Sequence, residues 1–512
     1  MEFISGAARE QMILLPDCVD DYIGEENAVR VIDAYVNSLD LQMLGFARPK
    51  PHDTGRPMYN PEDLLKLYIY GYMNRVRSSR RLEAETKRNL EVIWLLGKLS
   101  PDHKTIANFR RDNAAALKNV FRAFVKLCMK LGLYGKELVA IDGSKFKAVN
   151  SKDRNFSSKK LEERITRIES KIEEYLHELE DSDSEETAAE GEKSSEEIAQ
   201  IIVELSQRKE LYQGYADELA QTGELQKSLT DPDSRLMMGN GKMDVYYNVQ
   251  SVVDSAHNLI AEFDVTNVTD KNQLSGMADK AAEILGNKEL TALADKGYDS
   301  ASDIVRCLRA GMSVHVAGAE MDVCVPANEA EQEVIASHAN GRTVYIPERN
   351  IALCPMGQVL HPRYYKKRIG KAIFYNCKAC TKCSCKCTSG AFSQFEILMP
   401  EASFSREFDV QNLHIRQIHI SPDPKIIKQR KCIVEHPFGT VKRSMDAGYC
   451  LTKGLTNVSG EFSLTFLAYN FKRVINILGT AKLLEYIGAT VHSVYLCRLF
   501  HLPRLLLCLC LP

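Results

Sequence analysis

The sequence predicts an α/β protein in which a mixed sheet follows a region made only of helices. Between residues 20 and 135, apolar residues recur at helical spacing. From residue 136 onward, short apolar runs alternate with amphipathic stretches, which is typical of strands and helices that share one sheet. A length of 512 residues predicts several domains or large insertions, and a hydrophobic share of 45% is enough for a substantial core.

The N-terminal region, residues 1–135, contains clustered arginines on its expected helices. A helix start is expected at Pro61, and a second at the Ser-Pro-Asp that opens the segment 100–113. Such Arg clusters suit contact with DNA phosphates, although a solvated helix face would have the same composition. We predict DNA contact for Arg75, Arg77, Arg80, Arg81, Arg110 and Arg111.

Two later apolar runs end on a carboxylate. The run LVAI is followed by Asp142, and LTALA is followed by Asp295, so we expect two buried strands that each deliver an acid at their end. Strands are also expected within 243–266, on both sides of a turn at 254–258. Taken singly, either Asp is more often an ordinary turn residue at the end of a strand.

A separate block occupies residues 155–230. Apolar residues step by three or four on both sides of an acidic polar stretch, EDSDSEETAAEGEKSS. This pattern predicts an antiparallel helical hairpin whose apolar stripe is its own packing seam.

A third acid, Glu435, lies in a basic segment that is expected to be mainly helical. Pro437 and Gly439 predict either that Glu435 precedes a helix starting at Pro437 or that the helix is kinked there. The basic residues around it are expected to contact DNA: Lys428, Arg430, Lys431 and Arg443.

The segments IDGSKFKAVNS, LADKGY and VEHPFGTVKR resemble the three active-site segments of bacterial insertion-sequence transposases of the DDE class. SPDHKTIANFRRDN and LAYNFKRVINI also resemble segments of that group, and the five occur in the same order. The sequence departs from the pattern at Lys428 and Lys431, where relatives often have Tyr and Arg.

The resemblance implies a ribonuclease-H-like core with Asp142 on its first strand, Asp295 on its fourth and Glu435 on a late helix. These acids would hold two Mg²⁺ or Mn²⁺ ions, Lys442 would contact DNA phosphate or orient the glutamate, and Lys145 would contact DNA. It further implies a homodimer that binds the terminal inverted repeats of a mobile element, cuts double-stranded DNA and joins it to a target. A nuclease of the same fold and an inactive DNA-binding copy are the alternatives.

Six of the 15 cysteines fall between Cys354 and Cys387. Their spacing predicts one structural Zn²⁺, with free thiols in a loop as the alternative. The preferred ligands are Cys354, Cys377, Cys380 and Cys383, with Cys387 as the main substitute. Basic and aromatic residues interleave between His361 and Cys387, which suits either a DNA-contacting surface or the core of a small module.

The expected organisation is a helical DNA-binding domain (1–135), a catalytic core in three pieces (136–154, 231–318 and 425–487), the helical-hairpin insertion (155–230), the Cys-rich insertion (319–424) and an atypical apolar tail (488–512). No signal peptide is visible at the N-terminus, and the charged tail is a poor membrane span. We therefore expect a cytoplasmic protein without a membrane partner. The net charge of −2 neither favours nor excludes nucleic acid.

Overall fold

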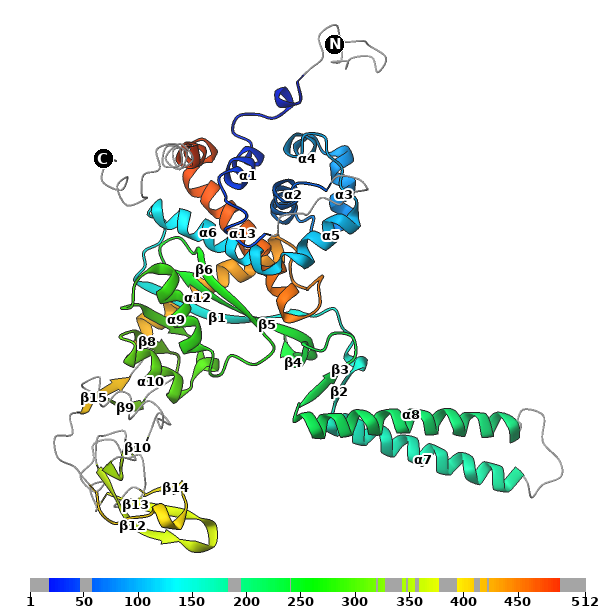
Figure 1. Cartoon of the computed structure of the whole chain (residues 1–512), viewed down its shortest axis with the longest axis vertical. Coiled ribbons are helices and arrows are strands. Elements are labelled where there is room, and N and C mark those ends of the chain that lie inside the picture. The colour runs from blue at the N-terminus through cyan, green and yellow to red at the C-terminus, as the bar shows by residue number, and fades with distance from the viewer. Residues whose placement is uncertain are drawn as a thin grey trace.

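The computed structural model describes residues 18–46, 58–182, 195–239, 241–318, 321–326, 343–346, 349–354, 359–376, 394–408, 415–420 and 423–488. In Figure 1, a group of helices lies above a central sheet, a two-helix arm projects to one side, and a small second sheet lies below. The α/β class predicted from the sequence, with a mixed sheet and an N-terminal helical region, is confirmed.

The N-terminal region is entirely helical within its described residues. Side-chain caps start several of its helices: Asn60 accepts from Glu62 N ahead of Pro61, and Asp102 accepts from Lys104 N and Thr105 N. The helices are η1 (Val19–Tyr22), α1 (Ala28–Asn37), α2 (Pro61–Met73), α3 (Ser79–Arg88), α4 (Leu90–Leu95), α5 (His103–Asp112) and α6 (Ala114–Lys130).

The central sheet contains six strands. They are β1 (Leu138–Lys147), β4 (Arg235–Gly239), β5 (Lys242–Asp254), β6 (Ile260–Thr266), β7 (Thr291–Ala294) and β8 (Ser313–Val316). Strand β5 pairs antiparallel with β1, β4 and β6, whereas β1, β7 and β8 are parallel to one another. Leaving out β4, the order across the sheet is β6-β5-β1-β7-β8.

Four helices of the second half of the chain pack on this sheet or beside it. They are α9 (Leu274–Leu285), α10 (Ala301–Arg309), α12 (Pro424–Gly439) and α13 (Leu455–Leu478). Helix α12 contacts β1 and β7, and α9 contacts β5 and β6. Helix α13 contacts α2 and α6 of the N-terminal region as well as β6, so it joins that region to the sheet.

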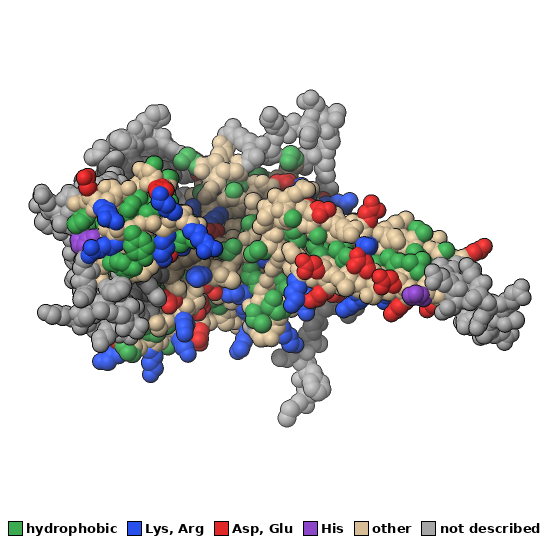
Figure 2. Space-filling view, turned by 90° about the horizontal axis from the view of Figure 1, so that it is seen from below, with side chains coloured by type: hydrophobic (Ala, Val, Ile, Leu, Met, Phe, Trp, Pro, Cys, Tyr) green, Lys and Arg blue, Asp and Glu red, His purple; other side chains and the backbone are tan. Residues whose placement is uncertain are grey.

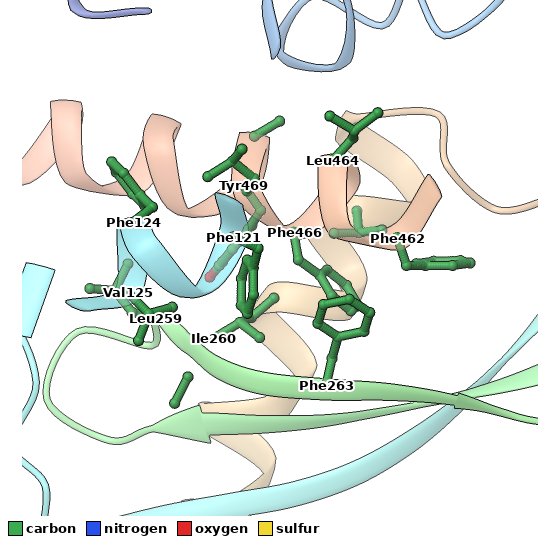
Figure 3. Packing of buried hydrophobic residues seen from close by; sticks show 14 of the residues in the cluster. Phe121, Phe124, Val125, Leu259, Ile260, Phe263, Phe462, Leu464, Phe466 and Tyr469 are labelled. Carbon is green, nitrogen blue, oxygen red and sulfur yellow. The ribbon is translucent and has the colours of Figure 1, made fainter. Parts of the chain in front are cut away.

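Aromatic rings fill the layer between α6, α13 and β6 (Figure 3). Phe263 of β6 meets Phe121 of α6 and Phe466 of α13 edge-to-face, with ring centroids 5.2 and 5.1 Å apart. Phe124 stacks on Phe471 at 4.1 Å. These rings are fully buried, and each contributes about 1.5–3 kcal/mol by leaving water.

The two-helix arm consists of α7 (Ser158–Ser182) and α8 (Ser195–Thr222), in the range expected for a helical hairpin. It is joined to the sheet by the short strands β2 (Asn155–Ser157) and β3 (Gln226–Ser228), which pair with each other. At this junction Phe156, Leu161 and Leu219 form a small buried cluster.

A second, antiparallel sheet of five strands lies in the range 344–398. Its strands are β10 (Val344–Ile346), β11 (Ile351–Leu353), β12 (Val359–Lys366), β13 (Lys371–Tyr375) and β14 (Gln394–Leu398). Buried Leu360, Ala372 and Phe374 belong to its core. A separate pair, β9 (Met321–Pro326) and β15 (Ile415–Ile420), lies between this sheet and the main body in Figure 1. The described helices include none with the length and apolarity to cross a membrane.

Candidate active site

Asp142 lies in the middle of β1, not at its end as expected. It pairs in register with Ser251 of β5, and this antiparallel ladder continues to Lys147. The parallel ladder with β7 stops earlier, at Ala140 and Leu293. Because β5 continues beyond β7, β1 stays extended after Asp142, and the carboxylate faces the edge that β7 leaves open.

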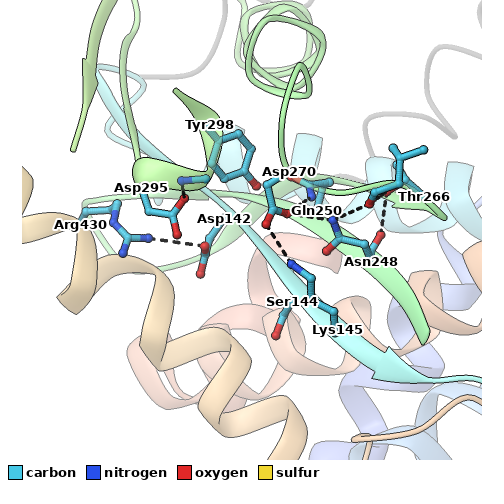
Figure 4. A network of polar contacts seen from close by, with 12 residues as sticks. Asp142, Ser144, Lys145, Asn248, Gln250, Thr266, Asp270, Asp295, Tyr298 and Arg430 are labelled. Atoms are coloured by element: carbon cyan, nitrogen blue, oxygen red, sulfur yellow. Dashed lines mark hydrogen bonds and ion pairs between the residues drawn. The ribbon is translucent and has the colours of Figure 1, made fainter. Parts of the chain in front are cut away.

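Asp295 follows directly after β7, as predicted. Its Oδ1 accepts a hydrogen bond from Gly297 N at 2.8 Å and caps the short helix η3 (Lys296–Tyr298). Parallel strands β1 and β7 thus bring Asp142 and Asp295 to the same region of the sheet, where Figure 4 shows them side by side.

Arg430 of α12 points at this pair. Its Nη1 lies 3.4 Å from Asp142 Oδ1, and the two side chains are only 13% and 20% exposed. Arg430, one of the predicted DNA contacts, forms an ion pair with Asp142 (Figure 4). The sequence missed this role because residues 142 and 430 meet only through the packing of α12 on β1.

The pKa of Asp142 is raised to about 6, mainly by burial; Arg430 lowers it, and the neighbouring carboxylates of Asp295 and Asp270 raise it. Crowded, poorly hydrated carboxylates destabilise each other's charged forms. A site of this kind gains most from a bound cation.

The third acid beside this pair is Asp270, which the sequence analysis did not single out. Its carboxylate accepts hydrogen bonds from Lys145 Nζ at 2.9 Å, Asn248 Nδ2 at 2.8 Å and Gln250 Nε2 at 2.8 Å. Burial alone would raise its pKa, but the bonds from Asn248 and Lys145 outweigh burial and hold the pKa below the usual value. Asp270 follows β6 by four residues and no apolar run ends on it, so the sequence carries no clear signal for it.

Two glycines allow these carboxylates to approach the backbone. A Cβ on Gly143 would overlap Asp270 Oδ1 and Gln250 Nε2, and a Cβ on Gly297 would lie 2.9 Å from Asp295 Oδ1. Packing therefore explains why position 143, in the Asp-Gly-Ser-Lys segment, is a glycine. Only a residue without a side chain leaves room for the Asp270 carboxylate beside β1.

Lys442 belongs to the π-helical turn Thr440–Ser444, which continues α12. Its Nζ donates to Ser144 Oγ at 2.6 Å and to the Lys145 carbonyl at 3.0 Å, so it links this turn to β1 just beyond Asp142. Burial and the nearby Lys145 lower the pKa of Lys442. π-turns are frequent at functional sites.

Glu435 is exposed and lies within α12, which runs unbroken from Pro424 to Gly439. The prediction of a helix starting at Pro437 is wrong. Pro437 lies inside the helix. Proline lacks the backbone N–H that would donate to the preceding turn, yet the helix does not end there and continues into the π-helical turn. Glu435 lies about 7.5 Å farther along the helix axis than Arg430 and on a different side.

The structure therefore brings together Asp142, Asp295, Asp270 and Arg430, with Lys145 and Lys442 beside them. It does not bring Glu435 into the same cluster: in the parts of the chain that the structure describes, no three His, Cys, Asp or Glu side chains are placed to hold one metal ion. The carboxylate oxygens at this site are nevertheless the ligand type that Mg²⁺ and Mn²⁺ prefer. The carboxylates of Asp142 and Asp295 fit a hard divalent cation in their chemistry.

The predicted DNA contacts divide into two kinds. Arg77 and Arg110 are buried, which corrects their assignment: Arg77 pairs with Glu461 and donates to the Asp446 and Tyr449 carbonyls, and Arg110 donates to the Tyr72 hydroxyl. Apart from Lys145 and Arg430, which are paired with Asp270 and Asp142, the others are exposed at the surface, namely Arg75, Arg80, Arg81, Arg111, Lys428, Lys431 and Arg443.

The zinc prediction falls mostly outside the described residues. Cys377, Cys380, Cys383 and Cys387 all lie there, and only Cys354, buried after β11, is described. The structure therefore neither places the predicted ligands nor supports a zinc ion.

Comparison with known families adds two matches. Residues 17–112 match a family described as "Transposase domain (DUF772)", and residues 353–475 match one described as "Transposase DDE domain". No curated protein matches the chain significantly. A solved structure of piggyBac transposase in a synaptic complex with hairpin DNA is similar at 8% identity, with a TM-score of 0.29 over 94% of this chain and 83% of that one, a likeness too low to carry an argument.

The two matched families lie on either side of the central strands. One covers most of the N-terminal helices, and the other covers α12 with Arg430, Glu435 and Lys442. The segment between them contributes Asp142 and Asp295, whose carboxylates lie side by side beside β7 (Figure 4). The chain is therefore a DDE-type transposase, a phosphoryl-transfer enzyme that acts on DNA.

Proposed function

We propose that this transposase cuts DNA at the ends of its mobile element and joins the freed 3′ hydroxyl to target DNA, using Asp142, Asp295 and Glu435 as its catalytic acids. The observation that carries this proposal is the close placement of Asp142 and Asp295 at the open edge between β1 and β7, with the pKa of Asp142 raised by burial. Acids crowded in this way favour a divalent cation.

The strand order supports a ribonuclease-H-like core. In the order β6-β5-β1-β7-β8, three antiparallel strands are followed by two parallel ones. Along the chain, Asp142 lies in the first of these five strands and Asp295 directly follows the fourth. On this proposal the arm and the segment from 319 to 424 are two insertions into one catalytic core. The helices of residues 1–135 form a separate DNA-binding domain.

Divalent ions, Mg²⁺ or Mn²⁺, would supply Lewis-acid chemistry at the scissile phosphate and at the attacking oxygen. The chain's own residues would hold these ions and orient the DNA. Asp142 and Asp295 are held by β1 and by the η3 cap, so their carboxylates are in position before DNA arrives.

Arg430 and Lys442 flank the acids from the side of α12. We propose that Arg430 exchanges its bond to Asp142 for a DNA phosphate, a geometry that guanidinium groups suit. Lys442 holds the strand beyond Asp142 through Ser144 and the Lys145 carbonyl. Glu435 would join the acids through a shift or rotation of α12, since it lies on the flank of that helix.

A strand-transfer assay tests the proposal. A labelled duplex carrying the sequence that flanks this gene is incubated with the protein, Mg²⁺ or Mn²⁺ and a plasmid target. We expect joined product with the wild type and none with Asp295→Asn, while the variant still binds the duplex because its loss is a metal ligand and not a phosphate contact.

Asp299→Asn is the matched control, because Asp299 is exposed, lies four residues further on and belongs to no part of the cluster. Cutting without joining would favour a nuclease of the same fold. Binding without cutting under either metal would favour an inactive DNA-binding copy, and unchanged cleavage by Asp295→Asn would refute the catalytic assignment.

A further inference from the structure

The arm joins the sheet through a segment that is rich in Lys and Arg. From residue 145 to residue 160 the chain has six such residues and a single acid, Asp153. Four of the six are exposed: Lys147, which is paired with Asp244, and Lys152, Arg154 and Lys159. The last three are considered together and are called the arm root below.

The outer part of the arm has the opposite charge. From residue 172 to residue 182, at the outer end of α7, there are five Asp or Glu and no Lys or Arg. Figure 2 shows Lys and Arg side chains where the arm leaves the body and acidic side chains farther out. A polyanion would be attracted to the base of this arm and repelled by its outer half. A solvated helix face has no need of such segregation.

The arm root is held in a fixed conformation. Lys160 Nζ donates to the carbonyls of Lys152 and Asn155, at 2.8 Å each, and lies over the Phe156 ring. Leu229 N donates to the Arg154 carbonyl at 3.0 Å. The backbone that displays Lys152 and Arg154 is therefore preorganised, and a ligand would not have to order it.

The arm-root cations are also available. Neighbouring cations are already paired: Lys147 lies 2.8 Å from Asp244, and Lys227 pairs with Glu218. Among the residues that the structure describes, no acid forms an ion pair with Lys152, Arg154 or Lys159.

Strand β1 connects the active site to the arm root (Figure 1). At about 3.3 Å per residue, Lys147 lies about 17 Å along the strand from Asp142, and Lys152 lies at most about as far again. B-form DNA rises about 3.4 Å per base pair, so this reach corresponds to about five to ten base pairs.

We propose that the arm root is a second DNA-contact surface, which binds the backbone of the duplex about five to ten base pairs from the phosphate at Asp142 while the acidic outer half of the arm is directed away from the DNA. The proposal rests on the function proposed above, because the duplex it binds is the one held at the acids. It adds a contact that the clustered arginines of the N-terminal region do not provide.

Binding of the full-length protein to a 40-bp duplex tests the proposal. The variant Lys152→Ala/Arg154→Ala/Lys159→Ala is compared with Lys126→Ala/Lys130→Ala/Lys288→Ala, a matched removal of three exposed cations on α6 and beside β7. Each lost phosphate contact lowers the slope of log K against log salt by about 0.9, so three lower it by about 2.7. Between about 50 and 200 mM salt, the affinity of the arm-root variant should then fall about 40-fold less than that of the wild type.

Phosphate-ethylation interference locates the contact on a duplex that the wild type cuts. We expect the arm-root variant to lose the interference about five to ten base pairs from the cut, while the control variant keeps the wild-type pattern. Equal thermal unfolding of the three proteins shows that the substitutions leave the fold intact.

An arm-root variant with the wild-type affinity and salt slope would overturn the proposal, and so would equal losses in both variants. Binding of the wild type to phosphatidylserine vesicles but not to the duplex would overturn it in favour of a membrane contact. A wild type that binds the duplex but never cuts it contradicts the proposed catalysis and leaves the affinity comparison valid, so the two failures can be told apart.

Discussion

The replacement Asp142→Asn should stabilise the metal-free protein at neutral pH. The folded site raises the pKa of Asp142 from its ordinary 3.8 to about 6, chiefly through burial. That difference corresponds to about 3 kcal/mol of unfavourable interaction once the carboxyl is ionised. Asn has nearly the same shape and carries no charge, so most of this cost should disappear.

The pH dependence has a definite sign. Between about pH 4 and pH 6 the folded protein binds the Asp142 proton and the unfolded chain does not, so stability from this group falls as the pH rises through that window. The gain from Asp142→Asn should therefore be close to zero at about pH 4 and reach up to about 3 kcal/mol above pH 7. This upper value already includes the attraction to Arg430, which lowers the pKa of Asp142.

Urea unfolding in EDTA, followed at several pH values, measures the difference. Asp254→Asn serves as the control: Asp254 lies beside the same strand, but its carboxylate accepts hydrogen bonds from the backbone N–H groups of Gly135, Lys136 and Ala256. That variant should be less stable than the wild type by about 1–3 kcal/mol. Adding Mn²⁺ should stabilise the wild type and not Asp142→Asn.

A variant Asp142→Asn that is no more stable than the wild type above pH 7, or a gain that is the same at every pH, would refute this reasoning. It would mean that Asp142 is either well solvated or fully compensated by Arg430. The charge on Asp142 would then not be destabilised by its surroundings, and the site would have no electrostatic need for a cation.

Three further predictions follow from the contacts described. Gly143→Ala should destabilise the protein by about 1–3 kcal/mol in urea unfolding, because its Cβ would overlap Asp270 and Gln250, whereas Gly276→Ala, in open space on α9, should be neutral or stabilising by up to about 1 kcal/mol. Arg110→Ala should cost about 3 kcal/mol of stability, because it leaves the buried Tyr72 hydroxyl unpaired. Arg111 is exposed, so Arg111→Ala should leave the melting temperature unchanged and affect only DNA binding. Equal melting temperatures of the two variants would contradict this prediction. Metal analysis should find about one zinc per chain, lost on Cys377→Ser with Cys380→Ser, and zinc-free folded protein would remove that site.

The acids on strands could be predicted because their signal is local. An apolar run of four or five residues followed by Asp indicates a buried strand and a carboxylate, and this pattern placed Asp142 and Asp295 beside strands, while the family resemblance singled them out. The exact end of β1 could not be predicted, because its continuation past Asp142 depends on the length of β5, more than 100 residues later.

Contacts between residues far apart in the chain could not be predicted from the sequence. Arg110 has the composition of a DNA contact, and it is buried because Tyr68 and Tyr72 of α2 fold over it. Asp270 is held in place by Lys145 on β1 and by Asn248 and Gln250 on β5. The expectation for Pro437 failed for the opposite reason: a local rule about proline was applied where packing of α12 on β1 and β7 overrides it.

The position of α13 has a consequence for incomplete versions of this protein. Its rings Phe462, Phe466 and Phe471 fill the space between the N-terminal helices and the sheet, yet they are made after almost everything they touch. During synthesis, the parts of Phe121, Phe124 and Phe263 that α13 covers stay exposed to solvent until this helix has been made. A gene copy interrupted by a stop codon before residue 455 would yield a chain with exposed apolar surface, which aggregates or is degraded by proteases. Such a chain would not compete with the intact enzyme for DNA.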